Sequence, residues 1–303
     1  MDSRKASRKL SIFLKTVMCF TNDLFQSNRK RRVLMRTTKR ATKASVTMSD
    51  LFFDFVISRS ILLYFLWRKI FQYNKMVLPL SGSEPKYTTR RWSAPKGVNN
   101  NNCYAYAFGD YEAYRWQKSI PGDRSGMSNG YHNYTHCKTL PQRVLSDNPK
   151  KVYRTDATTP CKKGYYKVMM FVCPGRPTNF LRQGDFHFYR QHGVCEYKIK
   201  PGDTVKSVAS FFKIPENRIK IAAARVGGFA KGKRIVFMCN LWSHKRGWAT
   251  GPLLTDSKGK MIKDPRKAGR NYPGLNYSKY CSSFCVKNRG IKVGKTHPKV
   301  GKK

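Results

Sequence analysis

Residues 195–240 carry a complete pattern of strand, helix, helix and strand, which limits how the surrounding chain can fold. Residues 197–199 predict a short strand and residues 234–237 a closing one. Between them, residues 219–223 predict a second helix, and Asp203 or Thr204 caps a first helix with an apolar stripe of Val205, Val208, Ala209 and Phe212. Such a unit can be inserted between two strands of a larger domain when its own ends lie close together.

A second informative stretch is the run of four asparagines at residues 99–102, which ends in Cys103. Asparagine is a favoured N-cap, and no proline follows before residue 116, so we predict a helix over residues 103–116. A thiol at a helix N-terminus is favoured as thiolate and is therefore more nucleophilic. The alternative is that Cys103 is a small buried hydrophobic residue.

Two histidines lie on predicted strands downstream of Cys103. Residues 185–190 alternate so that His187 and Tyr189 share one face and two phenylalanines share the other, and residues 241–245 form a further strand with His244. A cysteine with two strand-borne histidines can form a nucleophile–base pair with a polar third member. We therefore predict Cys103 as nucleophile, His187 as general base and acid, and His244 as the residue that orients His187. The alternation alone would also fit a His187 that is exposed and has no catalytic role. His192 lies in polar surroundings, and we expect it at the surface.

Several strings in this region resemble a known family. They are NCYAYAFGD, IPGDRSGMS, GDFHFYRQ, WSHKRG and DSKGKMIKDPRKAGRNY, spread over residues 92–286. They resemble a group of phage, bacterial and viral proteins related to the papain-like cell-wall amidohydrolases of the NlpC type. The resemblance implies an α+β fold in which residues 76–192 and 241–290 form a papain-like mixed domain. It also implies a cell-wall-directed cysteine amidohydrolase or peptidase, with the loop at residues 121–126 either beside the nucleophile or a plain connection.

The segment at residues 195–240 resembles a LysM domain, in agreement with its β-α-α-β pattern. LysM domains bind glycans that contain N-acetylglucosamine, such as peptidoglycan and chitin. The resemblance places glycan contacts at Gly202, Asp203, Thr204, Val205, Val226 and Gly227. Ala223 and Ala224 replace the asparagine that usually follows the second helix, which weakens the expected affinity more than the expected fold.

The charge of the chain restricts its partners. It has 61 Lys and Arg against 16 Asp and Glu, a net charge of +45, without a recognisable nucleic-acid motif. Such a chain binds nucleic acid, acidic glycans or an anionic membrane surface without specificity. The features together resemble proteins of large algal DNA viruses, which implies a virion location and contact with other virion proteins. The alternative to an enzyme is a non-catalytic minor capsid protein between capsid, membrane and genome.

The N-terminal and C-terminal segments differ from the rest. Residues 1–75 form a basic extension with an apolar run at residues 51–67, interrupted by Asp54 and Arg59 and shorter than the roughly 20 residues of a clean membrane span. This run predicts a membrane anchor, an amphipathic surface helix, or a segment outside the working protein if translation begins at Met76. Residues 291–303 predict a basic tail.

The nine cysteines do not predict a metal site. Their number is odd, no Cys-x-x-Cys motif occurs, and Cys281 and Cys285 lack a matching second pair. We therefore expect mainly reduced cysteines with one or two disulfides, and neither a metal nor a cofactor.

Overall fold

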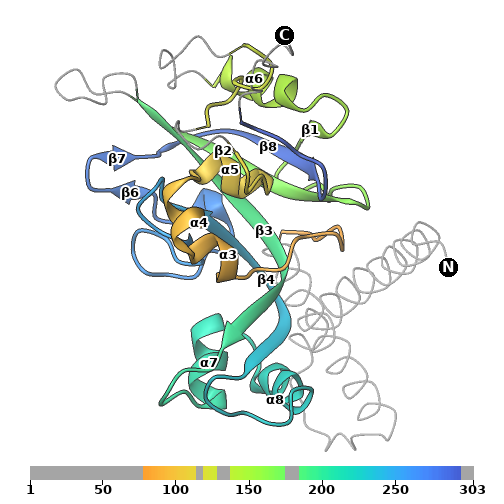
Figure 1. Ribbon diagram of the computed structural model, residues 1–303, viewed down its shortest axis with the longest axis vertical. Helices are drawn as coiled ribbons and strands as arrows, with labels where there is room; N and C mark the ends of the chain where they lie inside the picture. The colour runs from red at the N-terminus through yellow and green to blue at the C-terminus, as the bar shows by residue number, and fades with distance from the viewer. Residues whose placement is uncertain (1–77, 114–118, 128–136, 175–183, 295–303) are drawn as a thin grey trace, which may run out of the picture. The chain divides into compact units, whose positions relative to one another are not determined.

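The computed structural model describes residues 78–113, 119–127, 137–174 and 184–294 (Figure 1). The predictions for residues 1–75, including the apolar run and the start at Met76, lie outside the described residues, as does the tail from residue 295.

None of the helices in the described ranges combines the length and apolar character needed to cross a membrane.

The centre of the fold is a six-stranded antiparallel sheet of strand order β1-β8-β2-β3-β4-β5. Its strands are β1 (Val152–Thr155), β2 (Tyr165–Cys173), β3 (Asp185–Lys198), β4 (Arg234–Lys245), β5 (Pro252–Leu253) and β8 (Lys279–Lys287). A separate two-stranded ribbon pairs β6 (Asn271–Tyr272) with β7 (Leu275–Asn276). The mixed α+β class that the sequence predicts is therefore correct.

The helices in the described ranges are short. They are α3 (Arg90–Ser93), α4 (Pro95–Asn99), α5 (Cys103–Phe108), α6 (Leu140–Asp147), α7 (Val205–Phe212), α8 (Glu216–Ala224) and the 3-10 turn η1 (Pro265–Lys267). The start of α5 agrees with the prediction, because the Asn102 side chain accepts hydrogen bonds from the main-chain N–H groups of Tyr104 and Ala105. The predicted extent to residue 116 is wrong. The helix ends at Phe108 because Gly109 takes a left-handed conformation, with φ of 75°.

The two faces of β3 are covered by different cores, as its alternation predicts. Phe186 and Phe188 pack with α5, and the Phe188 ring stacks on Tyr104 with centroids 5.0 Å apart. Tyr189, on the opposite face, packs with Phe171 and Trp242. His187 is only 2% exposed, so it is not the exposed surface histidine that the alternation left open.

The strands β3 and β4 continue beyond the sheet as a two-stranded ladder that carries α7 and α8 at its far end (Figure 1). A second core forms there from residues of both helices and both strands, including Phe212, Ile219 and Ile235. Thr204 is the N-cap of α7 and forms a capping box with Ser207. The element order over residues 195–240 is thus strand, helix, helix, strand.

A buried glutamate fixes residues 86–90 to this ladder. Glu196, whose side chain is 4% exposed, forms salt bridges with Lys86, Arg90 and Arg234 at N–O distances of 3.2, 2.8 and 3.2 Å. Burial would raise the pKa of Glu196, but the hydrogen bonds and charges of Arg90 and Lys86 outweigh it and lower the pKa.

Replacing Glu196 with glutamine is expected to destabilise the fold by about 1–3 kcal/mol at pH 7, because it removes charge-assisted hydrogen bonds from a buried acceptor. Since the folded-state pKa is lowered, this stability is present above the unfolded pKa of about 4.3 and is lost as the pH falls through the folded value. The melting temperatures of the wild type and of Glu196→Gln, measured from pH 7 to pH 3, should therefore converge at the acidic end. The matched control is Glu112→Gln, which breaks an exposed pair with Lys96 and should change little. Equal losses in the two variants would contradict the prediction.

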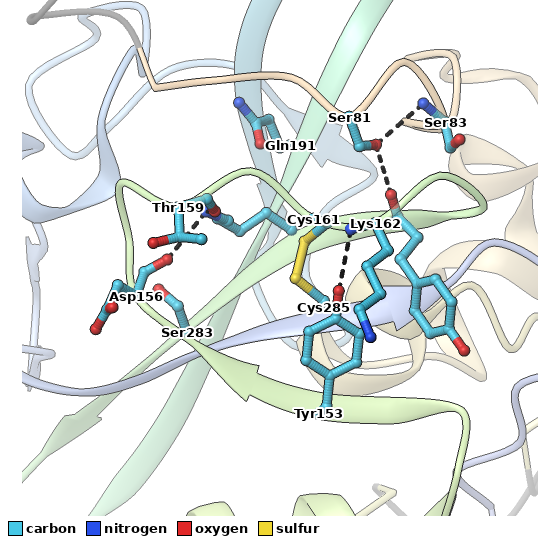
Figure 2. The surroundings of a disulfide bond; sticks show 12 residues. Ser81, Ser83, Tyr153, Asp156, Thr159, Cys161, Lys162, Gln191, Ser283 and Cys285 are labelled. Atoms are coloured by element: carbon cyan, nitrogen blue, oxygen red, sulfur yellow. Dashed lines mark hydrogen bonds between the residues drawn. A yellow bond between two sulfur atoms is a disulfide. The ribbon is translucent and has the colours of Figure 1, made fainter. Parts of the chain in front are cut away.

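Three disulfides within the described residues correct the expectation of mainly reduced cysteines. They join Cys137 to Cys281, Cys161 to Cys285 and Cys195 to Cys239. Figure 2 shows the Cys161–Cys285 bridge, beside which the Tyr153 hydroxyl accepts a hydrogen bond from the main-chain N–H of Lys162. Cys281 and Cys285 are thus occupied by disulfides and are not a metal-ligand pair. The sequence could not reveal this, because the partners are 144 and 124 residues away.

The first residues of the predicted tail belong to the packed structure. Ile291 and Val293 are buried, and Asp110 accepts hydrogen bonds from the Lys292 ammonium and the Val293 N–H. Residues 291–293 are thereby attached next to the end of α5 and are not part of a tail.

Candidate functional site

His187 and His244 form a hydrogen-bonded pair across β3 and β4. His187 Nε2 lies 2.7 Å from His244 Nδ1, and His244 Nε2 lies 3.0 Å from the carbonyl oxygen of Thr255. A carbonyl only accepts, so His244 Nε2 carries its hydrogen and, in a neutral ring, His244 Nδ1 accepts from His187 Nε2–H. Burial lowers the pKa of His244 to about 4, which keeps it neutral at pH 7. A neutral His187 then has its lone pair on Nδ1.

Aromatic rings fix the plane of His187. The Tyr277 ring stacks on it with centroids 4.7 Å apart, and Tyr189 meets it edge-on at 5.1 Å. The Tyr277 hydroxyl donates to the Asp185 carboxylate at 2.8 Å. Burial raises the pKa of both tyrosines, which therefore stay neutral in the physiological range. The imidazole pair is thus held in a largely aromatic, low-dielectric environment.

Cys103 is the first residue of α5 and reaches the start of β3. Its Sγ lies 3.6 Å from the carbonyl oxygen of Phe186, the residue before His187. The side chain interacts electrostatically with Tyr189, Tyr277 and Lys245, which lie around the histidine pair. Cys103 is 2% exposed and belongs to the core under α5. It remains a thiol, as does Cys173, whereas six other cysteines of the described ranges form disulfides.

The loop that includes residues 121–126 lies against the start of α5. The Asn102 side chain donates to the carbonyl of Ser119 at 2.8 Å. The buried carboxylate of Asp147, at the end of α6, accepts from the Tyr104 hydroxyl and from the main-chain N–H groups of Gly122 and Ser125. The loop is therefore anchored beside the residue that precedes Cys103. No local sequence pattern indicates the role of Asp147, because its partners are 22 to 43 residues away.

Lys245 is a further residue whose importance the sequence analysis missed. It follows His244 on β4, is 0% exposed, and donates to the carbonyl oxygens of Val98, Asn101 and Gly247 at 2.9, 2.6 and 2.5 Å. These bonds connect the loop before Cys103 with the end of β4. The sequence around Lys245 does not indicate its burial, because lysine is almost never fully buried without partners and the partners here are main-chain carbonyls.

His192 is not a surface residue as predicted. It is 0% exposed, and its Nδ1 donates to the Pro85 carbonyl at 2.7 Å while its Nε2 accepts from the Ser243 hydroxyl at 2.6 Å. The Ser243 oxygen in turn accepts from the Tyr106 hydroxyl at 2.6 Å. Burial lowers the pKa of His192 well below its ordinary value, in agreement with a neutral ring. These hydrogen bonds attach Tyr106 of α5 and the chain at Pro85 to the sheet.

The predicted glycan-contact residues lie in two connected turns at the far end of the β3–β4 ladder. Gly202 takes a left-handed φ of 77°, and Asp203 accepts from the Tyr197 hydroxyl and the Lys200 N–H. Thr204 and Val205 follow as the cap and first residue of α7. Val226 and Gly227 are exposed after α8, and Lys233, which pairs with Ile199, donates to the Gly227 carbonyl at 2.6 Å. The two turns therefore border the same strand ends.

Across the ranges that the structure describes, no cluster of three or more His, Cys, Asp or Glu side chains is arranged to hold a metal ion. Comparisons with protein-family models, curated proteins and solved structures found no match to this chain. A functional assignment therefore depends on the chemistry of the site.

Proposed function

We propose that the chain is a cell-wall-directed cysteine amidohydrolase or peptidase, with residues 76–192 and 241–290 as a papain-like domain. The observation that carries this proposal is the His187–His244 hydrogen bond. In this bond the Nε2–H of His187 donates to Nδ1 of His244. The lone pair of a neutral His187 is then on Nδ1, and a general base for a thiol needs such a basic nitrogen. Cys103 is the proposed nucleophile because it is a thiol at the start of α5 whose sulfur contacts the main chain adjacent to His187.

The proposed reaction is acyl transfer in two steps. His187 takes the Cys103 proton, and the thiolate attacks an amide carbonyl carbon to give a tetrahedral oxyanion, with the Cys103 main-chain N–H as a donor to it. The C–N bond breaks as the imidazolium of His187 gives its proton to the leaving amine, which leaves a thioester. His187 then deprotonates water, which attacks the thioester, and the thiol is regenerated with a carboxylic acid product.

We further propose that residues 195–240 are a LysM-like insertion that holds a polymer rich in N-acetylglucosamine. Support comes from the β-α-α-β order and from the connected turns at Gly202–Val205 and Val226–Gly227. The insertion point also has suitable geometry, because His192 and Leu241 are paired directly across the β3–β4 ladder. The chain can therefore leave and re-enter the papain-like domain at one place.

A second candidate function is a non-catalytic structural protein of a virus particle. It is favoured by the burial of Cys103, which is 2% exposed, and by three disulfides that stiffen the fold. The net charge of +45 would suit a position against nucleic acid or an anionic membrane. A virion location and contacts with other virion proteins belong to this proposal.

The two candidates differ in what happens to amide bonds in isolated wall polymers. Purified protein, Cys103→Ser and a variant with residues 200–232 replaced by a two-residue turn should be incubated with peptidoglycan and with chitin-containing walls. This variant lacks the helices and turns of the proposed LysM-like unit but keeps Glu196 and the Cys195–Cys239 disulfide. An enzyme releases new amines and carboxylates, Cys103→Ser does not, and the excised variant keeps chemistry on soluble fragments but loses polymer binding at about 0.5 M salt, where counterion-driven binding is weak. No release by any protein would leave the structural candidate.

A further inference from the structure

The ammonium group of Lys245 is fully coordinated by main-chain carbonyls. It has three N–H donors, and all three are used, on Val98, Asn101 and Gly247. A neutral amine has only two N–H groups and could not serve three carbonyls. The geometry therefore requires the charged form in a side chain that is 0% exposed. Such a buried charge is retained only where its hydrogen bonds compensate for lost hydration.

The three carbonyls belong to segments on both sides of the candidate site. Val98 is in α4 and Asn101 is two residues before Cys103, so two of the bonds hold the loop that leads into α5. Lys245 itself follows His244 on β4. One side chain thus ties the approach to the proposed nucleophile to the strand that carries the orienting histidine.

The same ammonium interacts electrostatically with Cys103. Two tyrosines, Tyr189 and Tyr277, also interact electrostatically with this cysteine, and both are neutral at pH 7 because burial raises their pKa values. Lys245 differs from these two tyrosines in carrying a positive charge. A cation close to a sulfur favours thiolate over thiol.

We propose that Lys245 is a positioning residue of the candidate site, which fixes the loop before Cys103 against β4 and supplies the positive charge that favours the Cys103 thiolate. This inference rests on the proposed function, in which Cys103 is the nucleophile. From the sequence, stabilisation of the thiolate is expected from the helix dipole. A helix of six residues supplies this stabilisation only weakly, and the proposal assigns part of it to Lys245.

A matched lysine elsewhere in the fold provides the control. Lys167 on β2 is 1% exposed and donates to the carbonyls of Asp156, Ala157 and Thr159, so it makes the same kind of three-carbonyl contact. Its electrostatic partners are Arg266, Asp156 and Glu84 rather than Cys103. Lys167→Met and Lys245→Met should therefore lose similar stability, but only the second should change the thiol.

The test is the pH profile of Cys103 alkylation by iodoacetamide, followed by peptide mass spectrometry on the folded full-length protein. Lys245→Met should move the midpoint of the profile upward by about one pH unit and slow alkylation at neutral pH about tenfold. Lys167→Met should leave the midpoint unchanged. Equal profiles in folded Lys245→Met and wild type would overturn the proposal.

A second measurement keeps the proposal testable if Lys245→Met does not fold. The side-chain amines of lysines can be titrated by NMR in wild type and in Cys103→Ser. Loss of the thiolate should lower the titration midpoint of Lys245 and leave that of Lys167 unchanged, because a nearby negative charge stabilises the ammonium. An unchanged Lys245 midpoint overturns the proposal. If the shift occurs but no polymer is hydrolysed, the proposed function fails while the role of Lys245 stands.

Discussion

Replacing His187 with alanine is expected to reduce hydrolysis by about 10²–10⁴-fold, the usual contribution of a general acid–base residue, and to slow alkylation of Cys103 at neutral pH. The physical reason is that His187 is the group whose basic nitrogen is defined by the hydrogen bond to His244, and the thiolate requires a proton acceptor. The rate of polymer hydrolysis and the rate of iodoacetamide labelling measure the two effects separately. Cys173, a second buried thiol, serves as an internal reference for labelling.

His244→Ala should reduce activity less than His187→Ala, because an orienting residue acts only through the base that it holds. His244→Asn should recover part of the loss if its side-chain oxygen accepts the His187 Nε2–H. The matched control is His192→Ala, which removes another buried neutral histidine with a 2.6 Å hydrogen bond but should leave Cys103 labelling unchanged. Labelling of Cys103 that is unaffected in folded His187→Ala would contradict the assignment of the base.

The parts of the fold that follow from local periodicity could be predicted from the sequence. The alternation of Phe186 and Phe188 with Tyr189 identifies the two faces of β3, and Thr204 identifies the start of α7. In both cases the determining residues are neighbours in sequence, so their pattern is visible without tertiary contacts.

The remainder depends on contacts between distant residues. Gly109 ends α5 early because its left-handed conformation and the contacts of Asp110 with Lys292 and Val293 direct the chain away from the helix, and neither contact is visible in the sequence around residue 109. His192 is polar and has polar neighbours, which suggested the surface. Its burial becomes possible only because Pro85 and Ser243 satisfy both ring nitrogens.

Some residues of the candidate site can likewise be predicted from the sequence, and others are revealed only by the structure. Cys103, His187 and His244 can be selected because reactive residue types stand out in a strand or at a helix start. The structure adds the direct bond between the two histidines and the position of Cys103 beside Phe186. Lys245 could not be distinguished from the other basic residues of a chain with 61 of them, since its three partners are main-chain carbonyls that any residue could supply.

The disulfides are expected to contribute more to stability than any other single feature. Cys161–Cys285 has a sequence separation of 124, but Cys137–Cys281 already joins the same two segments, so the second bridge adds a loop of only about 28 residues, 24 between Cys137 and Cys161 and 4 between Cys281 and Cys285. For this loop the chain-entropy relation gives about 3.6 kcal/mol. Cys195–Cys239, with a separation of 44, gives about 4.0 kcal/mol. Either value is a large part of the 5–15 kcal/mol by which domains are typically stable. Disulfides form and persist under oxidising conditions, and under the same conditions Cys103 must remain a thiol to take the role proposed for it.

Urea unfolding of the variants Cys161→Ser/Cys285→Ser and Cys195→Ser/Cys239→Ser tests this expectation. Each double variant should lose several kcal/mol, and the two losses should lie within about 1 kcal/mol of each other, because the loops that they open in the otherwise cross-linked chain are of similar length. Cys173→Ala is the matched control, since it removes a buried sulfur that closes no loop, and it should lose only about 1 kcal/mol. If the double variants lost no more than Cys173→Ala, the disulfides would have no cross-linking role. Losses that differ by several kcal/mol between the two double variants would instead show that local packing around the sulfurs, rather than chain entropy, determines their contribution.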